Sequence, residues 1–270
     1  MSETPSVTWE TALRDAYLQG RANVFLLHGA VSDFQWHPGG GFISLWDAVA
    51  ELLGRSRSFV VSVDGAGDGT ISHAETPAVV RAALAWARPG TRDASDVMAG
   101  GSIVLLPALG RLLSAPAHPC GVVVHQAELL LGQSMDLSTR VAVAKVRRWL
   151  DEPRIRDTNN VAVLVVDDIE SLSPLLARHP RLFPICIGLP TPAVRVAALR
   201  GELGDRVIDI SDARLTLATH EQSLADVASL CSRLASVSVE SIAKHFPNTS
   251  DEPDGDLPVS AEPALESTDV

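Results

Sequence analysis

The chain has 270 residues, 46% of them hydrophobic, so it is long enough for about two domains and apolar enough to pack a core. It carries 22 Lys and Arg against 33 Asp and Glu, a formal net charge of −11, which disfavours binding to nucleic-acid phosphates or to an anionic membrane. The excess is uneven, because residues 247–270 hold seven acidic residues and no Lys or Arg.

Targeting and redox features point to a cytoplasmic protein. No run approaches the roughly 18 to 20 apolar residues that span a bilayer, and residues 1–9 lack the basic start and apolar stretch of a secretory signal. Cys120, Cys186 and Cys231 lie far apart, with no CxxC pair and no His at metal-ligand spacing. We therefore expect no metal site, no disulfide framework and three buried thiols.

Helices and strands alternate over the first 190 residues. Apolar spacing predicts a helix from Trp9 to Tyr17, ended by Gly20, and a second from Ser44, whose hydroxyl can cap it. Short continuous apolar runs predict strands covered on both faces. The predicted strands are 23–27, 59–63, 122–124, 161–166 and 183–189, and the further helices are 78–87, 103–113 and 138–150. This alternation predicts one α/β domain over residues 1–191, with a parallel five-stranded sheet flanked by helices.

From residue 192 the pattern changes to helices alone. Helices are expected over 194–203, 223–234 and 239–246, which together make a small helical subdomain over residues 192–246. Residues 247–270 contain four Pro among their acidic residues and no aromatic residue. Such a segment buries too little apolar surface to offset its ordering entropy, so we expect a disordered acidic tail.

Two glycine-rich stretches are candidate phosphate-binding loops. One is Gly39-Gly40-Gly41, after the first strand, and the other is Asp64-Gly65-Ala66-Gly67-Asp68-Gly69, after the second. A nucleotide P-loop adds to such glycines a Lys for the phosphates and a Ser or Thr for magnesium, and neither stretch has that Lys. Turn-forming loops are the alternative for both. The candidate cofactor-binding residues are Gly29, Gly39, Gly40 and Gly41.

The pair His28-Gly29, with Trp36 shortly after it, also resembles the oxyanion loop of α/β-hydrolases. That family needs a GxSxG nucleophile elbow directly after a strand. The nearest match is Gly132-Gln133-Ser134-Met135-Asp136, which has Asp in place of the last Gly and follows no predicted strand. We therefore interpret His28 as a strand-end residue and rank a hydrolase lowest.

A more extended pattern begins at the third strand. Val122–Val124 is followed by His125, Gln126 and, one residue later, Glu128; the fourth strand ends in Asp167 and Asp168; and Arg178 and Arg181 precede the fifth strand. That strand ends in Leu-Pro, and a helix with Arg195 and Leu199 follows. In order and spacing these segments resemble the Walker B strand, the sensor 1 strand, the arginine-finger region, the fifth strand and the start of the lid of AAA+ ATPases.

The resemblance covers residues 1 to about 246. Residues 22–29 and 41–45 are most similar to the degenerate first module of actinobacterial two-module AAA+ proteins. The resemblance to AAA+ ATPases implies a P-loop-like fold, in which residues 192–246 form a lid. It also implies that subunits pack side by side, as AAA+ subunits do.

The departures from the AAA+ pattern concern the groups that hydrolyse ATP. The Walker A signature GxxxxGK[ST] is absent, and His125 and Gln126 occupy the positions of the Walker B Asp-Glu pair. A His supplies no carboxylate to the magnesium shell, a Gln cannot act as a base, and Glu128 lies three residues past the Asp position. The sequence therefore predicts no catalytic residues, no hydrolysis and no cofactor. The alternative is an ATP-binding ATPase with a divergent site near Gly29, Gly39–Gly41 and Gly67.

What remains for such a module is assembly. Arg178 or Arg181 would act as an arginine finger toward a partner AAA+ subunit or another copy of the chain, the alternative being two solvated surface cations. Asp167 and Asp168 are candidates for a sensor-1-like position or for a plain strand-end turn. Trp36 would either fill the vacated nucleotide pocket or form part of a protein-binding patch. Neither nucleic acid nor a membrane is expected as a partner.

Overall fold

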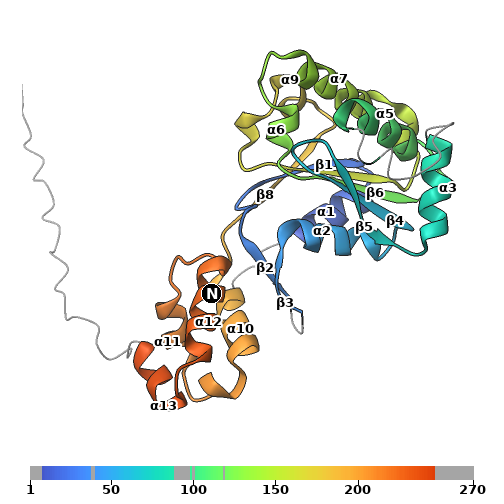
Figure 1. The fold of residues 1–270 in the computed structure, drawn as a ribbon. Helices are drawn as coiled ribbons and strands as arrows, with labels where there is room; N and C mark the ends of the chain where they lie inside the picture. The colour runs from blue at the N-terminus through green and yellow to red at the C-terminus, as the bar shows by residue number, and fades with distance from the viewer. Residues whose placement is uncertain (1–7, 38–39, 88–97, 99–100, 118, 247–270) are drawn as a thin grey trace, which may run out of the picture.

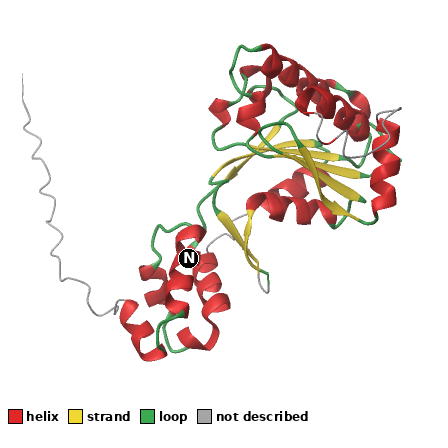
Figure 2. Cartoon of the chain, in the orientation of Figure 1, coloured by secondary structure: helices red, strands yellow, loops and turns green. Residues whose placement is uncertain are grey.

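A six-stranded sheet with helices on both faces forms the larger part of the molecule, and a cluster of short helices lies beside it (Figures 1 and 2). This computed structural model describes residues 8–37, 40–87, 98, 101–117 and 119–246. The expected tail over 247–270 lies outside the described residues, as does Gly39.

The sheet is mostly parallel, in the order β5-β4-β6-β7-β1-β8. Its parallel strands are the five that the sequence predicts: β1 (Val24–Gly29), β4 (Phe59–Val63), β6 (Cys120–Val124), β7 (Val161–Val165) and β8 (Phe183–Ile187).

The prediction of five strands is wrong by one, because β5 (Gly69–Ala74) pairs antiparallel with β4 at the sheet edge. Residues of β5 are largely exposed, so this strand leaves no apolar run in the sequence.

The two faces of the sheet are covered by different helices. On one face α1 (Trp9–Leu18) and α2 (Leu45–Gly54) bury Phe25 and Leu27 of β1. On the other face Val24 and Leu26 contribute to a core with the remaining helices. These are α3 (Pro77–Ala87), α5 (Gly101–Leu113), α6 (Ala127–Leu131), α7 (Leu137–Asp151), α8 (Pro153–Arg156) and α9 (Pro174–Ala177), with the turn η1 (Ile169–Ser171) before α9. This alternation of faces along β1 explains its continuous apolar run.

The C-terminal helices have a separate apolar core, to which Leu199, Val227 and Phe246 belong. They are α10 (Pro192–Leu203), α11 (Asp212–Ala218), α12 (Leu224–Ala235) and α13 (Val239–Ile242), with 3-10 turns η2 (Gly204–Val207) and η3 (Ala243–His245). The helix α11 was not predicted from the sequence. We call residues 192–246 the C-terminal cluster.

An antiparallel hairpin, also unpredicted, joins β1 to α2. Its strands are β2 (Phe34–His37) and β3 (Gly41–Ser44), and it extends from the end of β1 toward the C-terminal cluster (Figure 1). Trp36 and Phe42 of the hairpin pack against the core of that cluster. The hairpin therefore connects the two parts of the molecule.

All three cysteines are free thiols, and Cys120 and Cys231 are buried as predicted. The prediction is wrong for Cys186, which is exposed because β8 is an edge strand whose alternate residues face outward. Within the described part of the chain, no helix is long and apolar enough to cross a membrane.

Candidate functional site

The carboxyl end of β1 is the place where an open α/β sheet most often binds a ligand. From β1 the chain passes to α2 on one face of the sheet, and from the neighbouring strand β7 it passes to α9 on the opposite face. Ligands bind in the crevice at such a switch point, outside the carboxyl ends of the strands. Gly29, the last residue of β1, marks this crevice.

Backbone carbonyls of the neighbouring strands bond the first amides at this crevice. The amide of Gly29 donates to the carbonyl of Asp167 at 3.1 Å, and the amide of Ala30 donates to the carbonyl of Ile187 at 2.9 Å. Gly29 has φ +100°, and a Cβ at this position would lie 2.6 Å from the Ile187 carbonyl oxygen. The amides that could converge on an anion at this point are therefore already bonded.

Gly40 and Gly41, the described part of the glycine-rich stretch after β1, lie where the β2–β3 hairpin reverses direction. Gly40 donates to the carbonyl of His37 at 3.0 Å, and Gly41 has φ +71° and pairs with His37. A phosphate cradle needs several free amides that point at one spot. In the hairpin the strand residues Phe34–His37 and Gly41–Ser44 instead pair with one another.

A carboxylate occupies the N-terminus of α2, the helix that follows this segment. Ser44 is the N-cap, as the sequence predicts, and its hydroxyl accepts from the amide of Asp47 at 3.2 Å. The Ser44 hydroxyl also donates to the Asp47 carboxylate. A helix N-terminus attracts anions, and Asp47 supplies that negative charge from within the protein.

His125 packs beside α2 at the carboxyl end of β6. Its ring lies 5.4 Å from the ring of Trp46, centroid to centroid, at an angle of 65°. Burial lowers the pKa of His125, and the carboxylates of Asp47 and Asp64 partly oppose that shift. Its Nδ1 is buried and has no partner in the described part of the molecule. Burial therefore favours the neutral form of the ring.

Glu128 and Asp167 lie after the ends of β6 and β7, close enough for the charge of Asp167 to act on Glu128. Burial raises the pKa of Glu128, and the charge of Asp167 raises it further. The Oε2 atom of Glu128 is buried, without a hydrogen-bond partner among the residues described. This carboxyl group therefore holds a proton more readily than an ordinary Glu.

A comparison with protein-family models identifies this arrangement. A model described as the AAA+ chaperone N-terminal Rossmann-like domain matches residues 3–188. The chain belongs to this AAA+ family. The match ends directly after β8, so it covers the sheet with its helices and leaves out the C-terminal cluster. No protein of curated function matches the chain.

The AAA+ site residues that the sequence predicts lie at both edges of the sheet. His125, Gln126, Glu128 and Asp167 share the carboxyl edge with Gly29. Gln126 has φ +47° and is the N-cap of α6. Asp168 caps η1, where its carboxylate accepts from the amide of Glu170 at 2.9 Å.

Arg178 and Arg181 lie at the amino edge of the sheet, before β8. The guanidinium of Arg181 donates to the backbone carbonyls of Leu150 and Asp151, at 3.2 and 3.3 Å. It is therefore engaged at the C-terminal end of α7. Arg178 is the exposed C-cap of α9, and its guanidinium contacts no partner within the described ranges.

The remaining sequence candidates are structural. The stretch Asp64–Gly69 is the turn between β4 and β5, in which the Asp64 carboxylate accepts from the amides of Ala66 and Asp68. Ser134 of the hydrolase-like run donates to Asp136, and no described His contacts it. Both segments are held by hydrogen bonds within their own turns.

Trp36 packs on the C-terminal cluster, where a Cβ at Gly201 of α10 would lie 2.4 Å from its ring. It also lines a cavity of about 390 Å³ with Trp9, Pro190 and Thr191. The indole Nε1 is buried and has no partner in the described chain. Trp36 thus holds the hairpin against α10, a role that neither sequence hypothesis included.

Sequence reasoning missed Asp33, which lies just before β2. Its carboxylate accepts from the amides of Leu224 and Ala225, at 2.9 and 2.8 Å, and so caps α12 from outside that helix. The only local signal is an Asp in a loop, and its partners are 191 and 192 residues away in the sequence.

Proposed function

We propose that this chain is an AAA+ module without ATP hydrolysis, which acts in the cytoplasm as an assembly or regulatory subunit with a partner AAA+ protein or with copies of itself. The observation that carries the proposal is the β2–β3 hairpin. It stands between β1 and α2, where a nucleotide-binding loop would have to present free amides.

The residues around the crevice do not fit magnesium and a nucleotide. The segment from β1 to α2 contains no Lys or Arg, and Asp47 places a negative charge at the helix N-terminus. His125 and Gln126 supply no carboxylate, and burial raises the pKa of Glu128, which weakens it as a magnesium ligand. These features support the loss of hydrolysis and of tight nucleotide binding.

Nucleotide binding is tested by titrating a fluorescent ATP analogue into the protein, with and without magnesium, beside an AAA+ ATPase that has intact Walker motifs. We expect saturation only for the control protein. The unfolding temperature of this chain should also stay constant in millimolar magnesium–ATP. A nucleotide that did bind would raise it, because a ligand at 100 times its Kd stabilises the folded state by about 2.7 kcal/mol.

The alternative function, an ATPase with a divergent site, predicts the opposite results. Saturable magnesium-dependent binding would favour it over our proposal. A magnesium-dependent turnover that disappears in Arg181→Ala would overturn the loss of hydrolysis. As a further check, Asp47→Asn removes the charge at α2 but leaves the hairpin in place, so we expect no gain of nucleotide binding.

The assembly role is tested on the exposed arginine. Because Arg181 is bonded to the end of α7, Arg178 is the residue that we propose to reach a neighbouring subunit. We expect Arg178→Ala to reduce the ATP turnover of a co-purifying AAA+ partner at least about tenfold, as the loss of an arginine finger does. Arg14→Ala, on the exposed face of α1, is the matched control. Equal turnover with both variants would contradict this role.

A further inference from the structure

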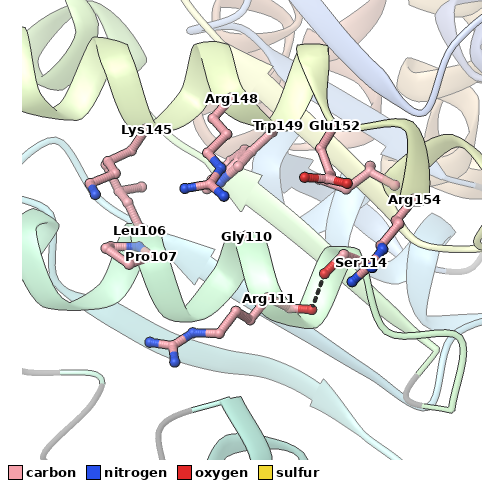
Figure 3. A pocket seen from close by; sticks show the side chains of 11 residues that line it. Leu106, Pro107, Gly110, Arg111, Ser114, Lys145, Arg148, Trp149, Glu152 and Arg154 are labelled. Carbon is pink, nitrogen blue, oxygen red and sulfur yellow. Dashed lines mark hydrogen bonds between the residues drawn. The ribbon is translucent and has the colours of Figure 1, made fainter.

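A groove runs between α5 and α7, away from the crevice at Gly29 (Figure 3). Its volume is about 390 Å³. Gly110 and the indole of Trp149 form the floor, and the two are in close contact, since a Cβ at Gly110 would lie 2.6 Å from Nε1 of Trp149. The absence of a side chain at Gly110 lets the indole of Trp149 pack directly against α5.

Basic side chains from three helices line the groove. They are Arg111 of α5, Lys145 and Arg148 of α7, and Arg154 of α8, and Glu152 is the only acidic residue among them. Figure 3 shows Lys145 and Arg148 extending from α7 toward α5. Within the described residues, none of the four basic side chains has a carboxylate within 4.0 Å.

This concentration of positive charge is unusual for a chain with a net charge of −11. Six of its 22 basic residues lie within residues 140–156. Like charges held close together repel one another, and a bound anion offsets that repulsion. The groove is therefore suited to a negatively charged ligand.

The arrangement of the cations favours an elongated ligand. Lys145 and Arg148 are three residues apart on α7, and Arg154 lies beyond the end of that helix. At a rise of about 1.5 Å per residue, the stretch of α7 from Lys145 to its end at Asp151 is roughly 9 Å long, and Arg154 follows it in α8. A single phosphate group cannot span that length, whereas about three residues of extended peptide can.

The chain itself contains a segment of the complementary chemistry. Residues 251–256 read Asp-Glu-Pro-Asp-Gly-Asp, and no Lys or Arg occurs anywhere in 247–270. We call residues 251–256 the acidic segment. Carboxylates form charge-assisted hydrogen bonds with Arg and Lys, and the Trp149 indole N–H, which donates to no described residue, is a further donor.

The groove of the same chain lies far from Phe246, the residue after which the acidic segment follows. Phe246 is at the end of the C-terminal cluster, which lies at the opposite end of the molecule from α5 and α7 (Figure 1). The ten residues from Phe246 to Asp256 extend at most about 36 Å. For comparison, a compact folded chain of about 246 residues has a radius of gyration of about 18 Å, hence a diameter of roughly 45 Å. A neighbouring molecule has no such limit.

We propose that the groove between α5 and α7 binds the acidic segment of a second copy of this chain. The contact joins two different surfaces, so it is heterologous and can extend from copy to copy. It does not depend on the crevice at Gly29, and a nucleotide bound there would leave it unchanged.

The direct test uses a fluorescent peptide of residues 247–270 and the full chain as receptor. The receptor carries Asp251→Asn, Glu252→Gln, Asp254→Asn and Asp256→Asn, so its own segment does not compete. We expect saturable binding that weakens as salt rises. Lys145→Glu with Arg148→Glu should weaken it by roughly tenfold or more.

The matched control is Arg14→Glu with Arg233→Glu, two exposed cations far from the groove with the same change in net charge. It should bind within about twofold of the parent receptor. Equal loss in both double variants, or equal binding of a scrambled-sequence peptide of the same charge, would overturn the proposal. Unchanged melting temperatures show that the variants are folded.

The second measurement is sedimentation velocity over a range of protein concentrations. The intact chain should self-associate, and both the groove variant and the neutralised segment should abolish this. A variant with Asp251→Lys, Glu252→Lys and Asp254→Lys should then associate with the groove variant but not with itself. If the two variants did not associate when mixed, or if the sedimentation coefficient of the intact chain did not change with protein concentration, binding between copies would be contradicted.

Discussion

Gly29 shows how one backbone position determines the packing at the end of β1. Its φ of +100° is unfavourable for any residue with a side chain, and a Cβ would lie 2.6 Å from the carbonyl oxygen of Ile187. Both features bring the end of β1 close to β8. The close contact between β1 and β8 at this point is separate from the missing Lys.

We expect Gly29→Ala to lower the free energy of unfolding by about 2–4 kcal/mol, through backbone strain plus displacement of β8. The control is Gly20→Ala, where φ is +67° but nothing lies within 4 Å of the added Cβ. That change should cost only about 1 kcal/mol. Urea unfolding of both variants measures the difference, and equal losses would argue against close contact between β1 and β8.

His125 and Glu128 should affect the pH dependence of stability in opposite directions. The folded-state pKa of His125 lies below its ordinary value of 6.5, so below that pH the unfolded chain takes up the proton more readily. Compared with His125→Gln, the wild-type protein should lose stability as pH falls from about 6.5. Urea unfolding at pH 5 to 8 gives this comparison.

The pKa of Glu128 in the folded state lies above its ordinary value of 4.5, so the folded chain binds the proton more readily. Compared with Glu128→Gln, the wild-type protein should gain stability as pH falls through the folded-state pKa toward 4.5. If both variants followed the wild-type pH profile, the two side chains would be solvated rather than buried.

At the scale of elements, the β2–β3 hairpin links the sheet to the C-terminal cluster. Asp33 caps α12 from the start of the hairpin, and Trp36 packs against α10. The start of α2 follows from a local rule, the capping hydroxyl of Ser44. The hairpin follows from no such rule, because its four-residue strands are only half-buried and lack a clear apolar alternation.

We expect Asp33→Ala to lower the free energy of unfolding by about 2 kcal/mol, because it leaves two amides at the α12 N-terminus without their acceptor. Amide hydrogen exchange should rise at Leu224 and Ala225. Asp209→Ala, an exposed change in the same cluster, should alter neither quantity. Unchanged exchange in Asp33→Ala would show that the cap contributes little to holding the hairpin against α12.

At the scale of the whole molecule, most of the excess negative charge lies in residues 247–270 and not in the segments that form the apolar cores. Removal of residues 247–270 takes away seven of the 33 acidic residues and no basic residue, so the net charge changes from −11 to about −4. The apolar cores of the sheet and of the C-terminal cluster both end by Phe246.

Truncation after Phe246 should therefore leave the melting temperature within about 2 °C of the full chain, measured at a protein concentration low enough to keep it monomeric. Elution from an anion-exchange column should shift to lower salt. A large loss of stability would mean that residues 247–270 pack on the folded chain, contrary to their composition.

The sequence by itself determined the α/β class, the positions along the chain of the five parallel strands and of most helices, and the absence of the Walker A Lys. Each of these depends on neighbouring residues, whose apolar spacing or identity can be read locally. The tertiary structure alone decided the edge strand β5, the hairpin, the cap from Asp33 to α12, the engagement of Arg181 and the basic groove beside Trp149. These features join exposed strands or residues far apart in the sequence, and no local pattern of hydrophobicity encodes such contacts.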